Sequence, residues 1–239
     1  MNIIIPTLGS NRGFKIPRYL IKINNIYLIQ HIVKKLNFGV NFIFIISYAD
    51  KIKFDSDKIL KKINPNCKIV ITKKKTKGIL QTLLLAKKYI NENPLIISNC
   101  DQFFNLDKIK LFKIIKNKNN FGCILTYSPK SKNHCFLKIK GNYVYFAAER
   151  KKISNIAAAG IYYIKNGLNF LKYVNRVIKK RITYNHMYYI SSTFNEMIHD
   201  NKKIIHMKLK HMSPLGSPGE LKQFIKKKNL KNSDFLDIF

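Results

Sequence analysis

The chain has 239 residues, of which 46% are hydrophobic and 12% aromatic, a composition that excludes intrinsic disorder and allows a core without disulfides or structural metal. Lysine and arginine number 45 against 12 acidic residues, for a formal charge of +33. The surplus is spread over the whole length, with clusters at 73–75, 150–152, 179–181 and 226–228. This spread favours a solvated basic surface over a nucleic-acid-binding arm, while anionic small substrates or lipid stay open as partners.

The cysteines and the hydropathy pattern indicate the compartment. Cys67, Cys100, Cys123 and Cys135 form neither a CxxC pair nor a disulfide framework, which indicates reduced thiols. Residues 1–6 lack the charged segment and long apolar run of a signal peptide. No stretch approaches the about 20 apolar residues of a membrane span. We therefore expect a cytoplasmic protein without a membrane span.

Short apolar runs alternate with helical patterns up to residue 100, which is typical of βα units and a parallel sheet. Strands are predicted at 3–5, 41–47, 68–72 and 94–98, and helices at 28–36, 56–63 and 79–90. The run at 41–47 contains no charge, so we expect its strand to be covered on both faces.

The pattern changes after residue 100. We expect a helix at 106–118, then strands at 123–127, 135–139 and 143–147, with Gly141-Asn142 as a hairpin turn. A strand at 161–164, helices at 167–181 and 191–200, a strand at 203–209 and a last helix from Pro218 follow. No linker interrupts the chain, so one domain over 1–239 is predicted, with a parallel half and a more antiparallel half.

Asp101 is the first candidate functional residue. The strand Leu95-Ile96-Ile97 delivers it to the carboxyl end of the predicted sheet, where open α/β folds bind ligands. Mg²⁺ prefers carboxylate oxygen and can share phosphate oxygens, so Asp101 is a candidate metal ligand. The alternative is a cap or turn residue before the following helix, and spacing alone does not separate the two.

The loop at 7–18 is the second candidate. It follows the first strand and combines Gly9 and Gly13 with Arg12, Lys15 and Arg18. Backbone amides and cations in such a loop can cradle a triphosphate. An ordinary surface loop of a lysine-rich protein is the alternative.

Two weaker candidates lie further along the chain. Thr76-Lys77-Gly78 precedes a helix, where glycine either lets a ligand approach the backbone or forms a turn. Glu149-Arg150-Lys151 ends a strand with one acid among cations, which is also typical of a surface ion pair.

Taken in order, these segments resemble the sugar-phosphate nucleotidyltransferase family, in particular its small bacterial branch associated with capsule and lipopolysaccharide sugars. The resemblance covers nearly the whole chain. It is carried by Ile3-Ile4-Ile5-Pro6 with Gly9, Pro17-Arg18, Thr76-Lys77-Gly78 with Gln81, Ser98-Asn99-Cys100-Asp101, Glu149-Arg150-Lys151, Ala159-Gly160 and Leu215-Gly216-Ser217-Pro218.

The resemblance implies an α/β fold with a Rossmann-like, mostly parallel (GT-A-like) sheet flanked by helices, and a smaller antiparallel element in the C-terminal half. It implies transfer of a nucleoside monophosphate from a nucleoside triphosphate (NTP) to a phosphorylated sugar or similar metabolite, with Mg²⁺ as cofactor and release of pyrophosphate. The process would be surface polysaccharide biosynthesis. Nucleic acid is not an expected partner.

The same resemblance assigns roles to residues. Asp101 would hold the metal, and Arg12, Lys15 and Arg18 the β- and γ-phosphates. The expected substrate contacts are Gly9, Gly78, Gln81 and Asn99, with Glu149, Arg150 and Gly160 on the acceptor side.

Departures from the family pattern keep two alternatives open. Arg12 is displaced by one residue in the loop, and Arg18 and Arg150 stand where the family has lysine, whose point charge differs from a guanidinium fork. A related glycosyltransferase and a catalytically impaired nucleotide-binding homologue are therefore the competing hypotheses.

Overall fold

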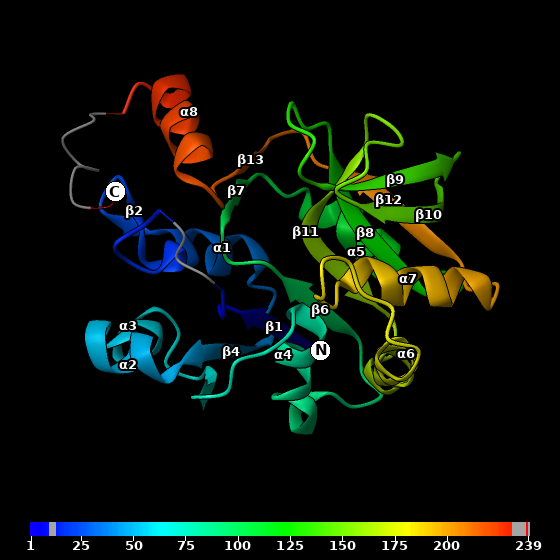
Figure 1. Cartoon of the computed structure of the whole chain (residues 1–239), viewed down its shortest axis with the longest axis horizontal. Coiled ribbons are helices and arrows are strands. Elements are labelled where there is room, and N and C mark those ends of the chain that lie inside the picture. Colours follow the sequence, from blue (N-terminus) through cyan, green and yellow to red (C-terminus); the bar gives the residue numbers. More distant parts are fainter. Residues whose placement is uncertain (10–12, 231–237, 239) are drawn as a thin grey trace.

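The computed structural model describes residues 1–9, 13–230 and 238. The described residues form a nine-stranded sheet with the strand order β5-β4-β1-β6-β11-β8-β12-β10-β9 (Figure 1). Its strands are β1 (Asn2–Pro6), β4 (Asn41–Ser47), β5 (Lys68–Thr72), β6 (Leu95–Ser98), β8 (Gly122–Tyr127), β9 (Cys135–Lys140), β10 (Tyr143–Glu149), β11 (Ala157–Ile164) and β12 (Ile204–Lys208). Two ribbons pair outside it: β2 (Lys22–Ile23) with β3 (Ile26–Tyr27), and β7 (Gln102–Phe104) with β13 (Met212–Pro214).

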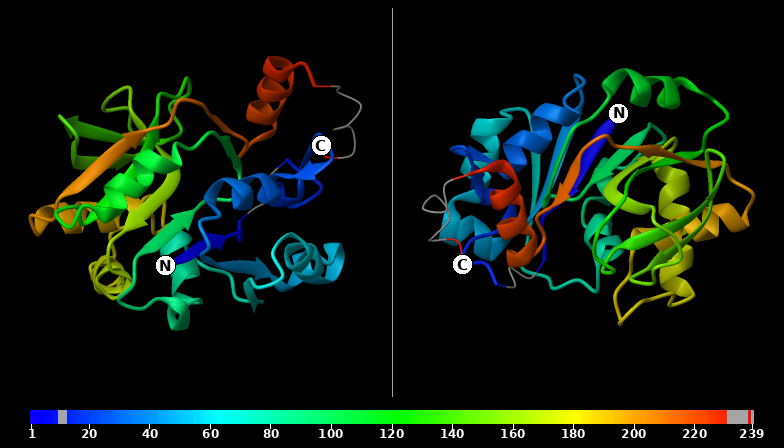
Figure 2. Two further views of the ribbon diagram at one scale, coloured as in Figure 1. Left: turned by 180° about the vertical axis from the view of Figure 1, so that it is seen from behind. Right: turned by 90° about the horizontal axis from the view of Figure 1, so that it is seen from above.

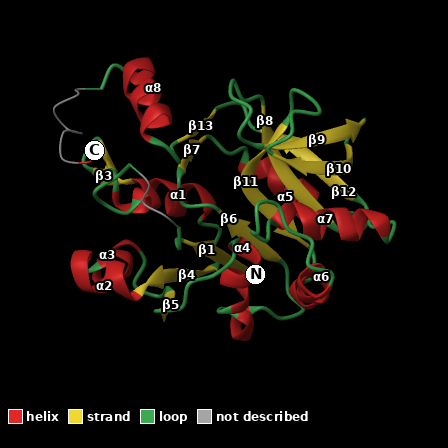
Figure 3. Cartoon of the chain, viewed as in Figure 1, coloured by secondary structure: helices red, strands yellow, loops and turns green. Residues whose placement is uncertain are grey.

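Helices surround the strands (Figure 3). They are α1 (Leu28–Leu36), α2 (Tyr48–Phe54), α3 (Ser56–Ile63), α4 (Ile79–Leu84), α5 (Lys108–Lys116), α6 (Gly167–Lys179), α7 (Ile190–His199) and α8 (Pro218–Lys228), with 3-10 turns η1 (Arg18–Leu20) and η2 (Lys87–Tyr89). No helix of the described residues is long and apolar enough to cross a bilayer.

An unbroken run of parallel strands is found in the N-terminal half only. β5, β4, β1 and β6 pair in parallel. The direction changes beyond β6. β11 is antiparallel to both β6 and β8, and β10 is antiparallel to both β12 and β9, whereas β12 is parallel to β8. The prediction of a mostly parallel sheet is therefore corrected to a mixed sheet, in which antiparallel strands are as integral as parallel ones.

Alternating side chains of the buried strands pack into two apolar layers, one on each face of the sheet. Ile3 and Ile5 of β1 face the layer that α1, α3, α5 and α8 join, and Ile4 faces the layer of α4, α6 and α7. Helices consequently cover both faces of the sheet (Figure 2). Each fully buried aliphatic side chain stabilises such a layer by roughly 1.5–3 kcal/mol.

Polar caps set where several helices begin. The Asp107 carboxylate accepts from the N–H of Lys110 at 2.9 Å and caps α5. Ser217 caps α8, whose first turn holds Pro218 as predicted. Ser47 caps α2, a helix that the sequence analysis did not predict because none of its side chains is buried.

The β7–β13 ribbon determines where the late part of the chain lies. β7 follows Asp101 directly, and β13 pairs with it antiparallel from Met212 to Pro214. The N–H of Leu215 then donates to the Asp101 carbonyl at 2.8 Å. The start of α8 is thereby brought beside the carboxyl end of β6.

Candidate active site

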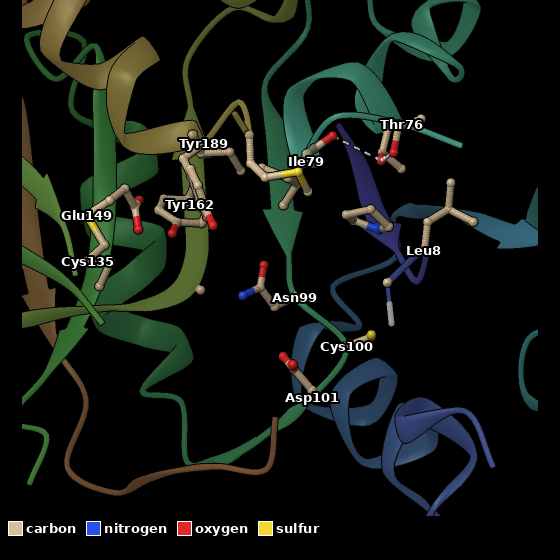
Figure 4. A pocket seen from close by; sticks show the side chains of 18 of the residues that line it. Leu8, Thr76, Ile79, Asn99, Cys100, Asp101, Cys135, Glu149, Tyr162 and Tyr189 are labelled. Carbon is tan, nitrogen blue, oxygen red and sulfur yellow. Dashed lines mark hydrogen bonds between the residues drawn. The ribbon is translucent and has the colours of Figure 1, made fainter. Parts of the chain in front are cut away.

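The carboxyl ends of β1, β5 and β6 open into a cavity of about 750 Å³ (Figure 4). A cavity of this size falls within the range of small-molecule and cofactor sites. Its walls are Pro6, Leu8, Gly9 and Arg18; Lys74, Lys75, Thr76, Gly78, Ile79 and Thr82; Asn99, Cys100 and Asp101; Asn133, His134, Cys135, Glu149 and Arg150; Ala158, Gly160 and Tyr162; and Met187, Tyr189 and Ile190. Segments far apart in sequence therefore meet at one place.

Most of the residues that the sequence singled out converge on this cavity. They are Gly9, Arg18, Gly78, Asn99, Asp101, Glu149, Arg150 and Gly160.

Two of the predicted residues, Lys15 and Gln81, are not brought there. The N–H of Lys15 donates to the Ile238 carbonyl at 2.9 Å, its side chain is exposed, and it is not part of the lining. Gln81 accepts from the N–H of Lys77 at 2.8 Å and closes the turn before α4. Arg12 lies outside the described residues.

Asp101 is held by Arg18. The guanidinium Nη1 donates to Asp101 Oδ2 at 2.7 Å and to the Gly216 carbonyl at 3.0 Å, and both side chains are about one-fifth exposed. Charge-assisted bonds of this length are stronger than neutral ones. Asp101 is thus an ion-pair partner on the cavity wall, whereas the helix cap of α5 is Asp107.

A second carboxylate, which the sequence analysis did not assign, lies close to this pair. A Cβ added to Gly216 would stand 3.0 Å from Asp101 Oδ2 and 3.5 Å from Glu220 Oε2, so both carboxylates approach the same backbone position. Glu220 comes from the first turn of α8. The signal that could have found it is its position shortly after Gly216-Ser217-Pro218, but its proximity to Asp101 depends on the β7–β13 ribbon.

The donor set at this place fits Mg²⁺ rather than a metal caged by protein. Within the described residues no three His, Cys, Asp or Glu side chains group as metal ligands. Mg²⁺ is usually bound through one or two carboxylates and completed by water and substrate phosphates. Asp101 and Glu220 provide such a pair.

The opposite end of the cavity is built around Glu149, at the end of β10. Its Oε1 accepts from Ser191 Oγ at 2.6 Å, and the Cys135 thiol also hydrogen-bonds the carboxylate. Burial raises the pKa of Glu149 above its usual value. Arg150 follows with a φ of 50°, and its N–H donates to the His134 carbonyl at 2.9 Å.

His134 is a cavity residue that the sequence did not single out. The Tyr127 hydroxyl lies 3.0 Å from its Nδ1 and the Ser131 hydroxyl 2.7 Å from its Nε2. Burial lowers the pKa of His134, while the charge of Glu220 acts in the opposite direction. A neutral, oriented imidazole near pH 7 follows from this environment.

Gly160 forms a close contact that only glycine allows. Its φ is +73°, and an added Cβ would lie 2.6 Å from both Asn99 Nδ2 and Gln102 Oε1. Asn99 lines the cavity. Gly160 therefore lets β11 approach the end of β6 closely enough to position the Asn99 amide.

Gly160→Ala should destabilise the protein by about 2 kcal/mol or more, because a side chain at positive φ costs roughly 1–2 kcal/mol and the overlap with Asn99 adds to it. Gly141→Ala is the matched control, since Gly141 also has positive φ (57°) but nothing within 4 Å of an added Cβ. Urea denaturation of both variants measures the difference. Equal losses would show that the Asn99 contact carries no energy.

No known protein family matches the sequence, and no curated protein matches it. Solved structures do match. A nucleoside-diphosphate-sugar pyrophosphorylase from Vibrio cholerae RC9 is 19% identical with a TM-score of 0.77, over 95% of this chain and 100% of its own. The inositol-1-phosphate CTP transferase from T. maritima is 12% identical with a TM-score of 0.74, over 95% and 93% of the two chains. A UDP-glucose pyrophosphorylase in complex with UDP-glucose is 15% identical with a TM-score of 0.74, over 95% and 98%.

The chain thus has an α/β nucleotidyltransferase fold. The similarity extends over nearly the full length of the chain, so the whole architecture is shared and not just a part of the sheet. At the level of fold, the resemblance to the sugar-phosphate nucleotidyltransferases is confirmed.

Proposed function

We propose that this protein transfers a nucleoside monophosphate from an NTP to a phosphorylated small molecule and releases pyrophosphate. The observation that carries the proposal is the cavity at the carboxyl ends of the parallel strands, which joins Asp101, Arg18, Lys74, Lys75 and Arg150 on one surface. Four cations and a carboxylate suit two phosphorylated ligands and a divalent ion.

The chemistry needs no side-chain nucleophile. An oxygen of the acceptor phosphate attacks the α-phosphorus of the NTP, the bond from that phosphorus to the β-phosphate oxygen breaks, and pyrophosphate leaves with its electrons. The attacking oxygen is already anionic, so no general base is required. Catalysis then rests on positioning and on neutralising the charge of the phosphates.

Asp101 and Glu220 would hold Mg²⁺, which supplies positive charge to the triphosphate oxygens when it is bound. Arg18 could contact both the metal ligand Asp101 and the triphosphate. Its guanidinium bridges Asp101 and the Gly216 carbonyl in the turn before α8. On arrival of the nucleotide, the guanidinium would exchange its bond with Asp101 for a phosphate oxygen. Arg12 and Lys15 stay proposed phosphate contacts on the strength of the resemblance.

The other predicted substrate residues are given roles according to their position. Gly9 and Gly78 line it beside β1 and α4, where the nucleotide would lie. Asn99 and Gly160 stand between the two ends, and Glu149 and Arg150 would contact the acceptor. Gln81, with its amide turned to the Lys77 N–H, would support the base-binding turn. Synthesis of nucleotide sugars for capsule or lipopolysaccharide is the process we propose.

The test is a screen of CTP, UTP, dTTP, ATP and GTP against phosphorylated sugars and amino alcohols, with pyrophosphate release as readout and EDTA as the metal control. Mg²⁺-dependent pyrophosphate release for one pair supports the proposal. Transfer from a nucleotide sugar without pyrophosphate would favour a glycosyltransferase. Nucleotide binding without turnover of any pair would favour a non-catalytic homologue.

A further inference from the structure

The carboxylate of Glu149 lies at the acceptor end of the cavity without a cationic partner. No lysine or arginine nitrogen of the described residues comes within 4.0 Å of it, and Arg150 acts on it only from a longer distance. Its bonded partners, Ser191 and Cys135, are neutral donors. A carboxylate offers about four acceptor positions, so these two donors leave positions that a ligand could use.

Leaving this acid unpaired is costly. Glu149 is partly buried. A carboxylate that is largely removed from water and has no counter-charge is disfavoured, and such an acid in a cleft is a candidate functional group. Two of the chain's 12 acidic residues line the cavity. Asp101 is paired with Arg18, whereas Glu149 has no ion-pair partner among the described lysines and arginines.

Aromatic side chains accompany Glu149 at this end. Tyr162 and Tyr189 line the cavity beside Glu149 and Cys135 (Figure 4). Tyr162 packs on Phe194 with ring centroids 5.7 Å apart, and Tyr189 on Tyr184 at 6.3 Å, so both rings are supported from behind. Ala158 and Gly160 complete this part of the wall with little bulk.

We infer that the acceptor carries a positively charged nitrogen in addition to its phosphate, and that Glu149, Tyr162 and Tyr189 bind this ammonium group. The inference rests on the proposed function and names its substrate class, a phosphorylated amine. A carboxylate beside aromatic rings complements an ammonium ion by charge and by cation–π attraction. Arg150, the next residue in the chain, supplies the opposite charge for the phosphate.

Ser191 is the positioning residue of this subsite. Its hydroxyl, buried at the start of α7, donates to Glu149 Oε1 at 2.6 Å and so fixes the orientation of the carboxylate. The groups facing Glu149 are therefore Ser191, Cys135, Arg150 and the hydroxyl of Tyr162. Arg150 is the one cation among them, and its guanidinium nitrogens lie beyond 4.0 Å from the Glu149 oxygens.

Matched ligand pairs that differ only in amine against hydroxyl test this inference. The pairs are 2-aminoethyl phosphate with 2-hydroxyethyl phosphate, and glucosamine 1-phosphate with glucose 1-phosphate, titrated calorimetrically into the full chain. We expect the amine member of at least one pair to bind the wild type at least about tenfold more tightly. In Glu149→Gln this ratio should fall towards one, while Glu92→Gln, at an exposed acid, should keep it. Ser191→Ala should reduce the ratio without changing the affinity for the hydroxyl member.

Three results would overturn the inference: hydroxyl members that bind as tightly in both pairs, an amine preference that survives in Glu149→Gln, or no binding of either amine. Pyrophosphate release separates it from the proposed function. Amine-selective binding without pyrophosphate from any NTP would retain the subsite and reject the reaction. Pyrophosphate release with hydroxyl acceptors alone would retain the reaction and reject the amine.

Discussion

Asp101→Asn should lower the rate of pyrophosphate release by about 10³-fold, because a metal-binding carboxylate supports several kcal/mol of transition-state stabilisation and each 1.36 kcal/mol is a factor of ten. Asparagine keeps the shape and can still accept from Arg18, so the fold should persist. The measurement is kcat at saturating Mg²⁺ and nucleotide, with the thermal midpoint as the check on folding.

Asp55→Asn is the control for this experiment. Asp55 is an exposed acid that pairs only with Lys58 among the ion pairs of the described residues, and it is not part of the cavity lining. Its removal should leave the rate within about twofold, since exposed ion pairs contribute little. Turnover of Asp101→Asn near the wild-type rate would reduce Asp101 to a structural partner of Arg18.

The sequence predicts those elements whose local pattern is self-sufficient. The strands at 41–47 and 68–72 and the helix at 56–63 are found with the expected bounds. The hairpin at Gly141-Asn142 joins β9 and β10, with Gly141 at positive φ. Each of these has an uninterrupted apolar run, an amphipathic period or a turn dipeptide that its neighbours do not contradict.

The direction of the central pairings could not be read in the same way. β6 and β11 are both buried on two faces, so an unbroken apolar run describes them equally well as parallel or antiparallel. Their antiparallel register, Ile161 with Ser98, depends on the route of the intervening chain. The β7–β13 ribbon joins segments more than a hundred residues apart, and no local signal announces it.

The residues of the candidate site also fall into two groups, those with a local sequence signal and those that only tertiary packing brings together. Asn99 and Asp101 were predictable because a buried strand carries them to a known edge of the sheet. Tyr162 and Lys75 enter the site through tertiary packing, and nothing in their immediate neighbours distinguishes them from core or surface residues. Glu220 follows Gly216-Ser217-Pro218, but only the β7–β13 ribbon brings it close to Asp101. Lys15 and Gln81 lie outside the cavity lining although the sequence singled them out, because a suitable residue type near a predicted site can still face elsewhere.

Arg18→Ala should lower turnover by about 10²-fold and at the same time tighten binding of Mg²⁺ to the nucleotide-free protein. The rate should fall because the guanidinium would no longer meet the triphosphate, and removal of one preorganised donor commonly costs 10²–10³-fold. Metal affinity should rise because Arg18 Nη1 occupies Asp101 Oδ2 at 2.7 Å and its charge repels a second cation at the same oxygen.

The opposite signs make this a sharp test of how Arg18 and the metal share Asp101. Arg18→Lys retains the charge but not the fork that reaches both Asp101 and the Gly216 carbonyl, so it should slow turnover less and leave Mg²⁺ affinity near the wild-type value. Arg176→Ala is the control for general loss of charge, because Arg176 on α6 pairs with Asp200 at the end of α7 and neither residue lines the cavity. Mn²⁺ titration followed by electron paramagnetic resonance reports affinity without turnover. Unchanged affinity in Arg18→Ala would mean that the ion, if bound, does not use the oxygen that Arg18 holds, and Glu220 would then be the carboxylate to replace.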